Sequence, residues 1–271
     1  MASAPVRSPV LQVFDRFGRA AVGAVEQLGR GAGLVVESIY WLIFGPSRRQ
    51  PVRPRAVFAQ MMEIGIKAVP IVGVMAATIG VMLAIQGIYT LRIFGAESRV
   101  TLGIALSITR EFAPLITGIL VAGRSGSALA ARIGTMKTNQ ELDALSVMGI
   151  NPVRFLVVPP LIACLIMVPA LTVFSDIVGL AAAGLYVGLE LGMSMAAYGN
   201  ELVAVLNARD VLHGIGKSVI FAVLIAVIGV LNGAAVTGGA EGVGRYTTRA
   251  VVQSIAAIVI TDMLFVFVVT R

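Results

Sequence analysis

The chain has 271 residues, of which 58% are hydrophobic and only 13% are charged, and its mean hydropathy is +0.93. Soluble domains carry about 25% charged residues, so this composition argues against an ordinary soluble enzyme and predicts a surface that mostly faces lipid. The long apolar runs do not alternate as the strands of a transmembrane barrel do. We therefore expect an all-α, polytopic membrane protein.

The net charge of +7 and the pI of about 10.2 would favour nucleic-acid binding in a soluble protein. In a membrane protein, basic residues flank the spans and meet anionic headgroups, so we expect no nucleic-acid partner. Cys164 is the only cysteine and His213 the only histidine, which leaves no disulfide framework, metal site or Ser-His-Asp triad to expect. The N-terminus shows no signal-peptide pattern.

The first 55 residues are predicted to form an interfacial and cytoplasmic segment, and residues 56–271 a five-span membrane domain. Residues 1–9 have the composition of a disordered start. Apolar and charged side chains then separate at helical spacing over residues 10–28, which indicates an amphipathic helix in the membrane interface. Residues 33–45 are apolar but too short to span, and residues 46–55 form a basic, proline-rich break. The role of this segment stays open.

Five apolar stretches predict five transmembrane helices: about 68–89, 101 to between 122 and 132, 155–189, 211–236 and 250–269. The third is too long for one straight crossing and contains Pro159, Pro160 and Pro169. We interpret it as one long kinked helix that starts in the interface, with two short passes as the alternative. Residues 190–210 predict an external loop with a short helix, and the glycine-rich residues 238–245 a tight turn.

The loop charges predict the orientation. The N-terminal segment, the 123–154 loop and the 237–249 turn carry an excess of Lys and Arg, whereas the 190–210 loop is mostly acidic. By the positive-inside rule the first three lie in the cytoplasm and the C-terminus lies outside.

Arg110 and Glu111 stand inside the second span. A charge at a helix centre costs about 2.5–3.5 kcal/mol on insertion scales, so such residues usually face a bundle interior or a wet cavity. They predict a polar lining for an amphiphilic substrate or a proton site; the alternative is a pair that pins helices or reaches the membrane surface. Neighbours on a helix do not face each other, so each needs its own partner, and the candidates are Lys217, Asp176 and Asp262.

A short helix is predicted between spans two and three, at about residues 138–149. Thr138 and Glu141 have the spacing of a capping box, Leu142, Leu145 and Met148 form an apolar stripe, and Gly149 stands where a helix-ending glycine would. The pattern fits equally a helix that docks into a partner's groove and one that lies on the lipid.

No ATPase motif accompanies these features. Gly239 and Gly244 have phosphate-loop spacing, but Arg245-Tyr246 follows where Lys and Ser or Thr are required. Ser125 and Ser127 have no base to activate them, and small residues for close helix packing explain them better. We expect no enzyme activity and no cofactor on this chain.

Several segments together resemble the MlaE/YrbE-type permeases, the membrane subunits of ABC lipid transporters that work with MCE proteins. The resemblance covers about residues 60–271. Its most specific parts are Ala-Gly-Arg-Ser-Gly-Ser at 122–127 and Gly-Val-Gly-Arg-Tyr-Thr-Thr at 242–248; Arg110-Glu111-Phe112-Ala113-Pro114 and Lys217-Ser218 also match.

The resemblance implies a homodimer of five-span subunits in a bacterial inner membrane, with a cytoplasmic ABC ATPase that binds ATP and a periplasmic MCE protein. It implies that phospholipid binds between the two subunits, and that transport contributes to outer-membrane lipid asymmetry. The implied lipid-pocket residues are Arg110, Glu111, Lys217 and Asp262. The implied ATPase-coupling residues are Glu141, Leu142, Leu145 and Met148.

Two other functions remain compatible with the residues alone. A proton-coupled secondary transporter would use Glu111 or Asp262 as a relay, and a membrane scaffold would use the charges only to pin helices.

Overall fold

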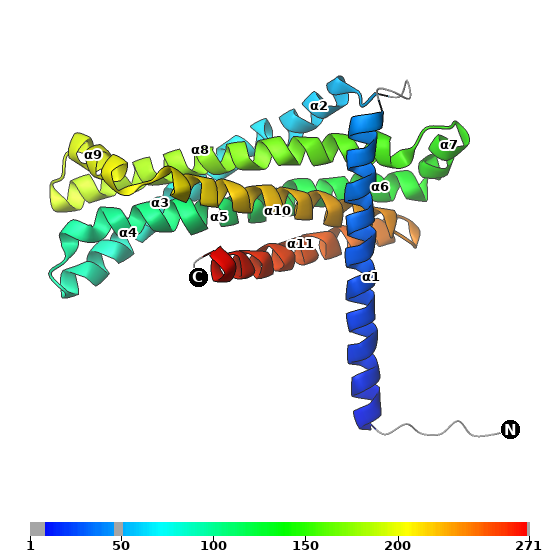
Figure 1. The fold of residues 1–271 in the computed structure, drawn as a ribbon, viewed down its shortest axis with the longest axis horizontal. Coiled ribbons are helices and arrows are strands. Elements are labelled where there is room, and N and C mark those ends of the chain that lie inside the picture. Colours follow the sequence, from blue (N-terminus) through cyan, green and yellow to red (C-terminus); the bar gives the residue numbers. More distant parts are fainter. Residues whose placement is uncertain (1–8, 46–50, 270–271) are drawn as a thin grey trace.

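The structure, a computed structural model, describes residues 9–45 and 51–269, and these are helical with no strand among them (Figure 1). Five helical segments are long and apolar enough to cross a membrane: Pro54–Ile93, Glu97–Thr138, Val153–Leu191, Ala208–Ala234 and Gly239–Val269. The predicted all-α, five-span fold is thereby confirmed. The third segment has 39 residues, about 58 Å at 1.5 Å per residue, so its ends extend past a hydrocarbon core of about 30 Å.

Each segment is built from consecutive helical pieces. The first comprises α2 (Pro54–Ile64), a 3₁₀ turn η1 (Ile66–Ala68) and α3 (Val69–Ile93). The second comprises η2 (Glu97–Arg99), α4 (Val100–Ser107), η3 (Ile108–Phe112), α5 (Ala113–Val121), η4 (Ala122–Gly126) and α6 (Ser127–Thr138). After α7 (Glu141–Val147) come η5 (Val153–Val157), α8 (Val158–Leu191), α9 (Met195–Val205), α10 (Ala208–Ala234) and α11 (Gly239–Val269). The pieces η3, η4 and η5 are π-helical turns.

The third apolar region is one continuous helix, so the alternative of two short passes is wrong. Pro159 and Pro160 fall in the first turn of α8, directly after the π-helical turn η5. Prolines are tolerated in a first turn because the backbone N–H groups there have no partner inside the helix. Only Pro169 lies inside α8.

The N-terminal region differs from its prediction because α1 (Pro9–Phe44) is a single helix, not two short ones. It lies roughly at right angles to the bundle and crosses it near the end where α7 lies (Figure 1). A Cβ at Gly31 would lie 3.0 Å from the Val227 side chain of α10, so α1 packs closely against α10 at this point. The glycines of α1 do not interrupt the helix. Residues 1–8 and 46–50, and many side chains of 10–28, lie outside the described part.

The packing of α3 on α8 depends on two facing glycines. The buried positions of α3 recur every four residues, at Val72, Ala76, Gly80, Ala84 and Ile88. A Cβ at Gly80 would lie 2.1 Å from the carbonyl oxygen of Gly179. The two backbones therefore touch directly, as small residues allow in membrane bundles.

The structure confirms the prediction for one connecting loop of the bundle and contradicts the prediction for another. The short helix predicted within 190–210 is confirmed as α9, where Ser194 caps the helix by accepting a hydrogen bond from the N–H of Ala197 at 3.2 Å. The predicted turn over 238–245 is wrong: only Gly238 and Gly239 have the left-handed backbone of a turn, and α11 already begins at Gly239. Two left-handed glycines suffice to reverse the chain, so the remaining residues continue into the helix.

Candidate functional site

Arg110 and Glu111 lie on the π-helical turn η3, and each has its own partner on another helix. The Arg110 guanidinium contacts Oδ1 of Asp210 through Nη2 at 2.5 Å and through Nε at 2.7 Å. The Nζ of Lys217 donates to Oε2 of Glu111 at 2.5 Å. Arg110 and Glu111 thus have separate partners, as helix geometry predicted for adjacent residues. Such π-helical turns are frequent at functional sites.

Lys217 is the centre of a network that joins three spans. Its side chain is 0% exposed, and its Nζ also lies 2.9 Å from Oδ1 of Asp262 on α11. The same nitrogen lies 5.8 Å from the centre of the Phe265 ring, a cation–π distance. The structure thus brings together all four predicted pocket residues, because Arg110 precedes Glu111 on the same turn. We call Arg110, Glu111, Asp210, Lys217 and Asp262 the charge network.

Asp210 is the member that the sequence did not reveal, since its charge was assigned to the external loop. It caps α10: the N–H of Asn207 donates to its Oδ2 at 2.9 Å, while Oδ1 holds Arg110. The Asp210 carboxylate therefore caps the start of α10 and also binds Arg110 of the second span. The capping-box spacing from Asn207 to Asp210 was the available signal.

Gly214 lets α10 approach η3 closely enough to form these pairs. A Cβ at this position would lie 2.3 Å from the carbonyl oxygen of Thr109. Gly214 lies one turn after Asp210 and nearly one turn before Lys217, so both partners depend on this contact. His213 stands beside it, with its ring edge-on to Phe265 at 4.9 Å.

One side of the charge network is open. A cavity of about 480 Å³ is lined by Arg110, Asn207, Ala208, Arg209 and Asp210. The side chains of Arg110 and Glu111 are 43% and 37% exposed, whereas Lys217 is completely buried. The arrangement therefore offers the Arg110 guanidinium to a charged ligand in this cavity, leaves the Glu111 carboxylate partly exposed, and keeps the Lys217 ammonium buried.

Asp176, the third candidate partner, stands apart from the charge network. It is buried in α8, and its Oδ1 has no hydrogen-bond partner among residues 9–45 and 51–269. No ion pair joins it to Arg110 or Lys217, whose partners are carboxylates of other helices.

The predicted short helix exists as α7, but it covers Glu141–Val147 rather than 138–149, and the predicted capping box is wrong. Thr138 is the last residue of α6, and its hydroxyl donates to the carbonyl of Gly134 at 2.9 Å. Thr side chains inside a helix often bond backward in this way. The residue before α7 is Gln140, whose φ is 60°.

The end of α7 agrees with its prediction. Gly149 has a left-handed backbone with φ of 72°. Its N–H donates to the carbonyl of Ser146 at 3.0 Å, and the N–H of Ile150 donates to that of Leu145 at 2.9 Å. These two bonds form a Schellman motif.

The apolar stripe of α7 faces mainly into the protein. Leu145 is buried, and Leu142 packs against the cluster of Leu129, Ile133, Val157 and Val230. Glu141, Val147 and Met148 are exposed. Leu142 therefore attaches α7 to α6, η5 and α10, and Glu141, Val147 and Met148 form the outer surface.

Replacing Gly149 with Ala should destabilise α7 by about 1 kcal/mol, since a left-handed backbone costs roughly 1–2 kcal/mol for residues with a Cβ. No side chain obstructs the site, as nothing lies within 4 Å of the added Cβ. Hydrogen exchange of residues 141–148 should become about fivefold faster. Gly244→Ala is the control, because its Cβ also meets open space but its φ is not positive. Equal exchange in both variants would contradict the account.

The arginine of the small-residue segment has a structural role. Arg124, on the π-helical turn η4, donates to the carbonyl of Glu63 at 3.2 Å and lies 3.8 Å from its carboxylate. Lys67 also bonds that carboxylate. A Cβ at Gly229 of α10 would lie 3.1 Å from the carbonyl of Gly126. As the sequence indicated, the small residues allow close packing between the second span and α10.

Comparisons with known proteins agree with this architecture. The family described as Permease MlaE matches residues 57–268. A probable ABC transporter permease protein of Synechocystis is 39% identical over 209 residues, 77% of this chain and 79% of the relative. One from Rickettsia conorii is 35% identical over 216 residues, 80% of this chain and 83% of the relative.

A relative from Haemophilus influenzae is named intermembrane phospholipid transport system permease protein MlaE. It is 30% identical over 261 residues, which are 95% of this chain and 96% of the relative. Together with the family match over 57–268 and the five spans of the fold, this similarity identifies the chain as a member of the MlaE family of ABC transporter permeases.

Proposed function

We propose that the chain is the membrane subunit of a transporter that moves phospholipid between a bacterial inner membrane and a periplasmic MCE protein, and thereby contributes to outer-membrane lipid asymmetry. The observation that carries this proposal is the charge network. The half-exposed Arg110 pairs with the buried Asp210, and the half-exposed Glu111 pairs with the buried Lys217. A phospholipid headgroup carries a phosphate that a guanidinium binds well. The phospholipid transport in the name of the Haemophilus influenzae relative supports the choice of substrate.

In this proposal the lipid pocket is completed by a second copy of the chain. Each copy contributes the same four residues to its half of the pocket. Arg110 and Glu111 contact the lipid, and Lys217 and Asp262 hold Glu111 in position. The ATP is bound by a separate ABC ATPase, because the chain carries no phosphate-loop sequence.

The energy-input end in this proposal is α7. It lies at the opposite end of the bundle from α9 (Figure 1), on the side that the loop charges place in the cytoplasm. Of the predicted coupling residues, Glu141 and Met148 contact the ATPase directly, and Leu142 and Leu145 pass its movement to the bundle. Val147 joins the contact surface because it is 88% exposed.

Replacing Val147 with Asp should abolish stable binding of the ATPase and lower ATP-driven lipid transfer at least tenfold. A charge in place of an exposed apolar contact must be desolvated in the interface, whereas the isolated chain should keep its thermal stability. Co-purification and transfer of fluorescent phospholipid between vesicles check this. Val203→Asp is the matched control, since Val203 is 82% exposed on α9. If Val147→Asp binds the ATPase as the control does, α7 is not the docking element.

The transfer assay also tests the function itself. Lipid transfer should require ATP and stop with vanadate, and it should persist when a protonophore removes the proton gradient. Transfer that a protonophore abolishes and vanadate does not would contradict the proposal and support a proton-coupled transporter.

A further inference from the structure

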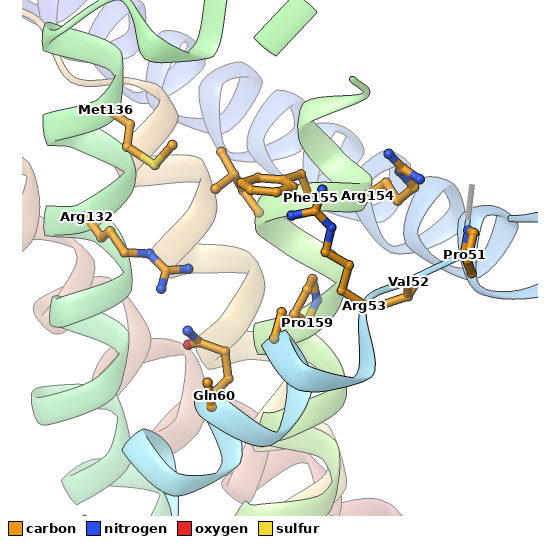
Figure 2. A pocket seen from close by; sticks show the side chains of 12 residues that line it. Pro51, Val52, Arg53, Gln60, Arg132, Met136, Arg154, Phe155 and Pro159 are labelled. Atoms are coloured by element: carbon orange, nitrogen blue, oxygen red, sulfur yellow. The ribbon is translucent and has the colours of Figure 1, made fainter. Parts of the chain in front are cut away.

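A second cavity, of about 370 Å³, lies between the start of α2, the α6 helix, η5 and the start of α8 (Figure 2). None of its lining residues belongs to the charge network. The cavity volume lies within the range of small-molecule binding pockets, about 300–1,000 Å³, which is enough for a charged headgroup. It is lined by Pro51, Val52, Arg53, Ala56, Ala59, Gln60, Arg132, Met136, Arg154, Phe155, Leu156 and Pro159.

The polar groups of this cavity are cationic or neutral, with no carboxylate among the lining residues. Figure 2 shows the guanidinium groups of Arg53, just before α2, and of Arg132 on α6 on two sides of one space, with the Gln60 amide of α2 beside it. Neither arginine has an ion pair within the described ranges 9–45 and 51–269, whereas Arg92 and Arg124 of the same bundle each contact a carboxylate. Within those described residues, no carboxylate compensates their positive charge.

Arg154 adds to this charge from the edge of the cavity. Its guanidinium lies 5.9 Å from the Trp41 ring centre, and its Nε is buried without an acceptor in the part of the chain that the structure describes. The nearby carboxylate of Glu37 accepts hydrogen bonds from Asn151 at 3.1 Å and from Trp41 at 3.4 Å, not from an arginine.

The rest of the lining is apolar. The apolar lining side chains include Met136 of α6 and Phe155, Leu156 and Pro159 of the third span, and the Phe155 ring centre lies 5.2 Å from the Arg53 guanidinium. Trp41 of α1 lies beside the Arg154 guanidinium and contacts the Tyr40 ring, and such aromatic side chains favour the headgroup level of a membrane. Cations beside an apolar wall at this level match a ligand with a phosphate at one end and hydrocarbon at the other.

We propose that this cavity binds one anionic phospholipid of the adjoining leaflet, with its phosphate between Arg53 and Arg132 and its glycerol end against Phe155 and Met136. The bound lipid joins α2, α6 and the start of α8 at the end of the bundle where α7 is attached. This site is separate from the charge network, so it does not depend on which substrate the transporter carries.

Native mass spectrometry of the full chain in detergent tests the proposal, with phosphatidylglycerol as the probe and phosphatidylcholine of the same acyl chains for comparison. The double variant Arg53→Gln/Arg132→Gln should bind phosphatidylglycerol at least fivefold more weakly, with phosphatidylcholine binding unchanged. Arg55→Gln is the matched control, because Arg55 is exposed on the same helix but does not line the cavity; it should bind as the natural chain does.

A second variant keeps every charge in place. Ala59→Trp should fill the cavity from an exposed position of α2 and weaken phosphatidylglycerol binding to a similar extent. Millimolar inorganic phosphate should not displace the lipid. Equal weakening by Arg55→Gln, full binding by Ala59→Trp, or complete displacement by inorganic phosphate would each overturn the proposal, the last in favour of a free-anion site.

Discussion

Replacing Lys217 with Met is expected to lower the free energy of unfolding by about 3 kcal/mol, the low end of the cost of removing one partner from a buried ion pair. Lys217 is 0% exposed and lies 2.5 Å from Glu111 and 2.9 Å from Asp262. Met fills a similar volume but leaves two carboxylates facing each other without a cation. The low end applies because Glu111 is 37% exposed and water reaches it.

Equilibrium unfolding of the purified chain in mixed micelles measures this loss. Adding Glu111→Gln and Asp262→Asn to Lys217→Met should recover more than half of it, because the unpaired charges are then removed. Lys67→Met is the control: Lys67 pairs with Glu63 on the surface, where a pair contributes about 0–1 kcal/mol. If Lys217→Met and Lys67→Met cost the same, the buried network does not hold the spans together.

Replacing Gly214 with Ala should separate α10 from η3 and reduce lipid transfer at least tenfold. The added Cβ would lie 2.3 Å from the carbonyl oxygen of Thr109, closer than any real contact, so a backbone must move. That movement pulls Asp210 from Arg110 and Lys217 from Glu111, whose pairs span 2.5 Å each. Overpacking alone costs about 1–3 kcal/mol.

Gly216→Ala controls for the change of residue type, because it lies two residues away on α10 and its Cβ would meet only Phe265 at 3.8 Å. This control should keep normal transfer, since Ala also favours a helix over Gly. Thermal unfolding and lipid transfer of both variants are the measurements. Normal transfer by Gly214→Ala would show that the close approach does not position the charge network.

The sequence predicted which residues form the charge network better than it predicted which of them pair with each other. Arg110 and Glu111 stood out because charges are costly inside an apolar span, and helix geometry required separate partners for neighbours. Glu111 pairs with Lys217, one of the predicted partners, and Lys217 in turn contacts Asp262. The Arg110 partner, Asp210, was missed because its position before an apolar run fits a loop or a cap equally well. Its second role depends on packing between segments 100 residues apart.

The helix α7 shows the same limit on a local scale. Its glycine end was predictable because a left-handed residue after a helix strongly favours Gly. Its start was not, because Thr138 can bond forward as a cap or backward within α6, and here it bonds back to Gly134. Periodicity alone also does not reveal that Leu142 packs against residues of α6, η5 and α10 and that Leu145 is buried.

A density map of the transporter complex in a lipid bilayer tests the central proposal most directly, at the position of Arg110 and Glu111. We expect two copies of the chain with elongated lipid density between their Arg110–Glu111 turns, and the phosphate end within hydrogen-bond distance of an Arg110 guanidinium. Direct protein packing across these turns, with lipid density only on the outer faces of the spans, would contradict the account.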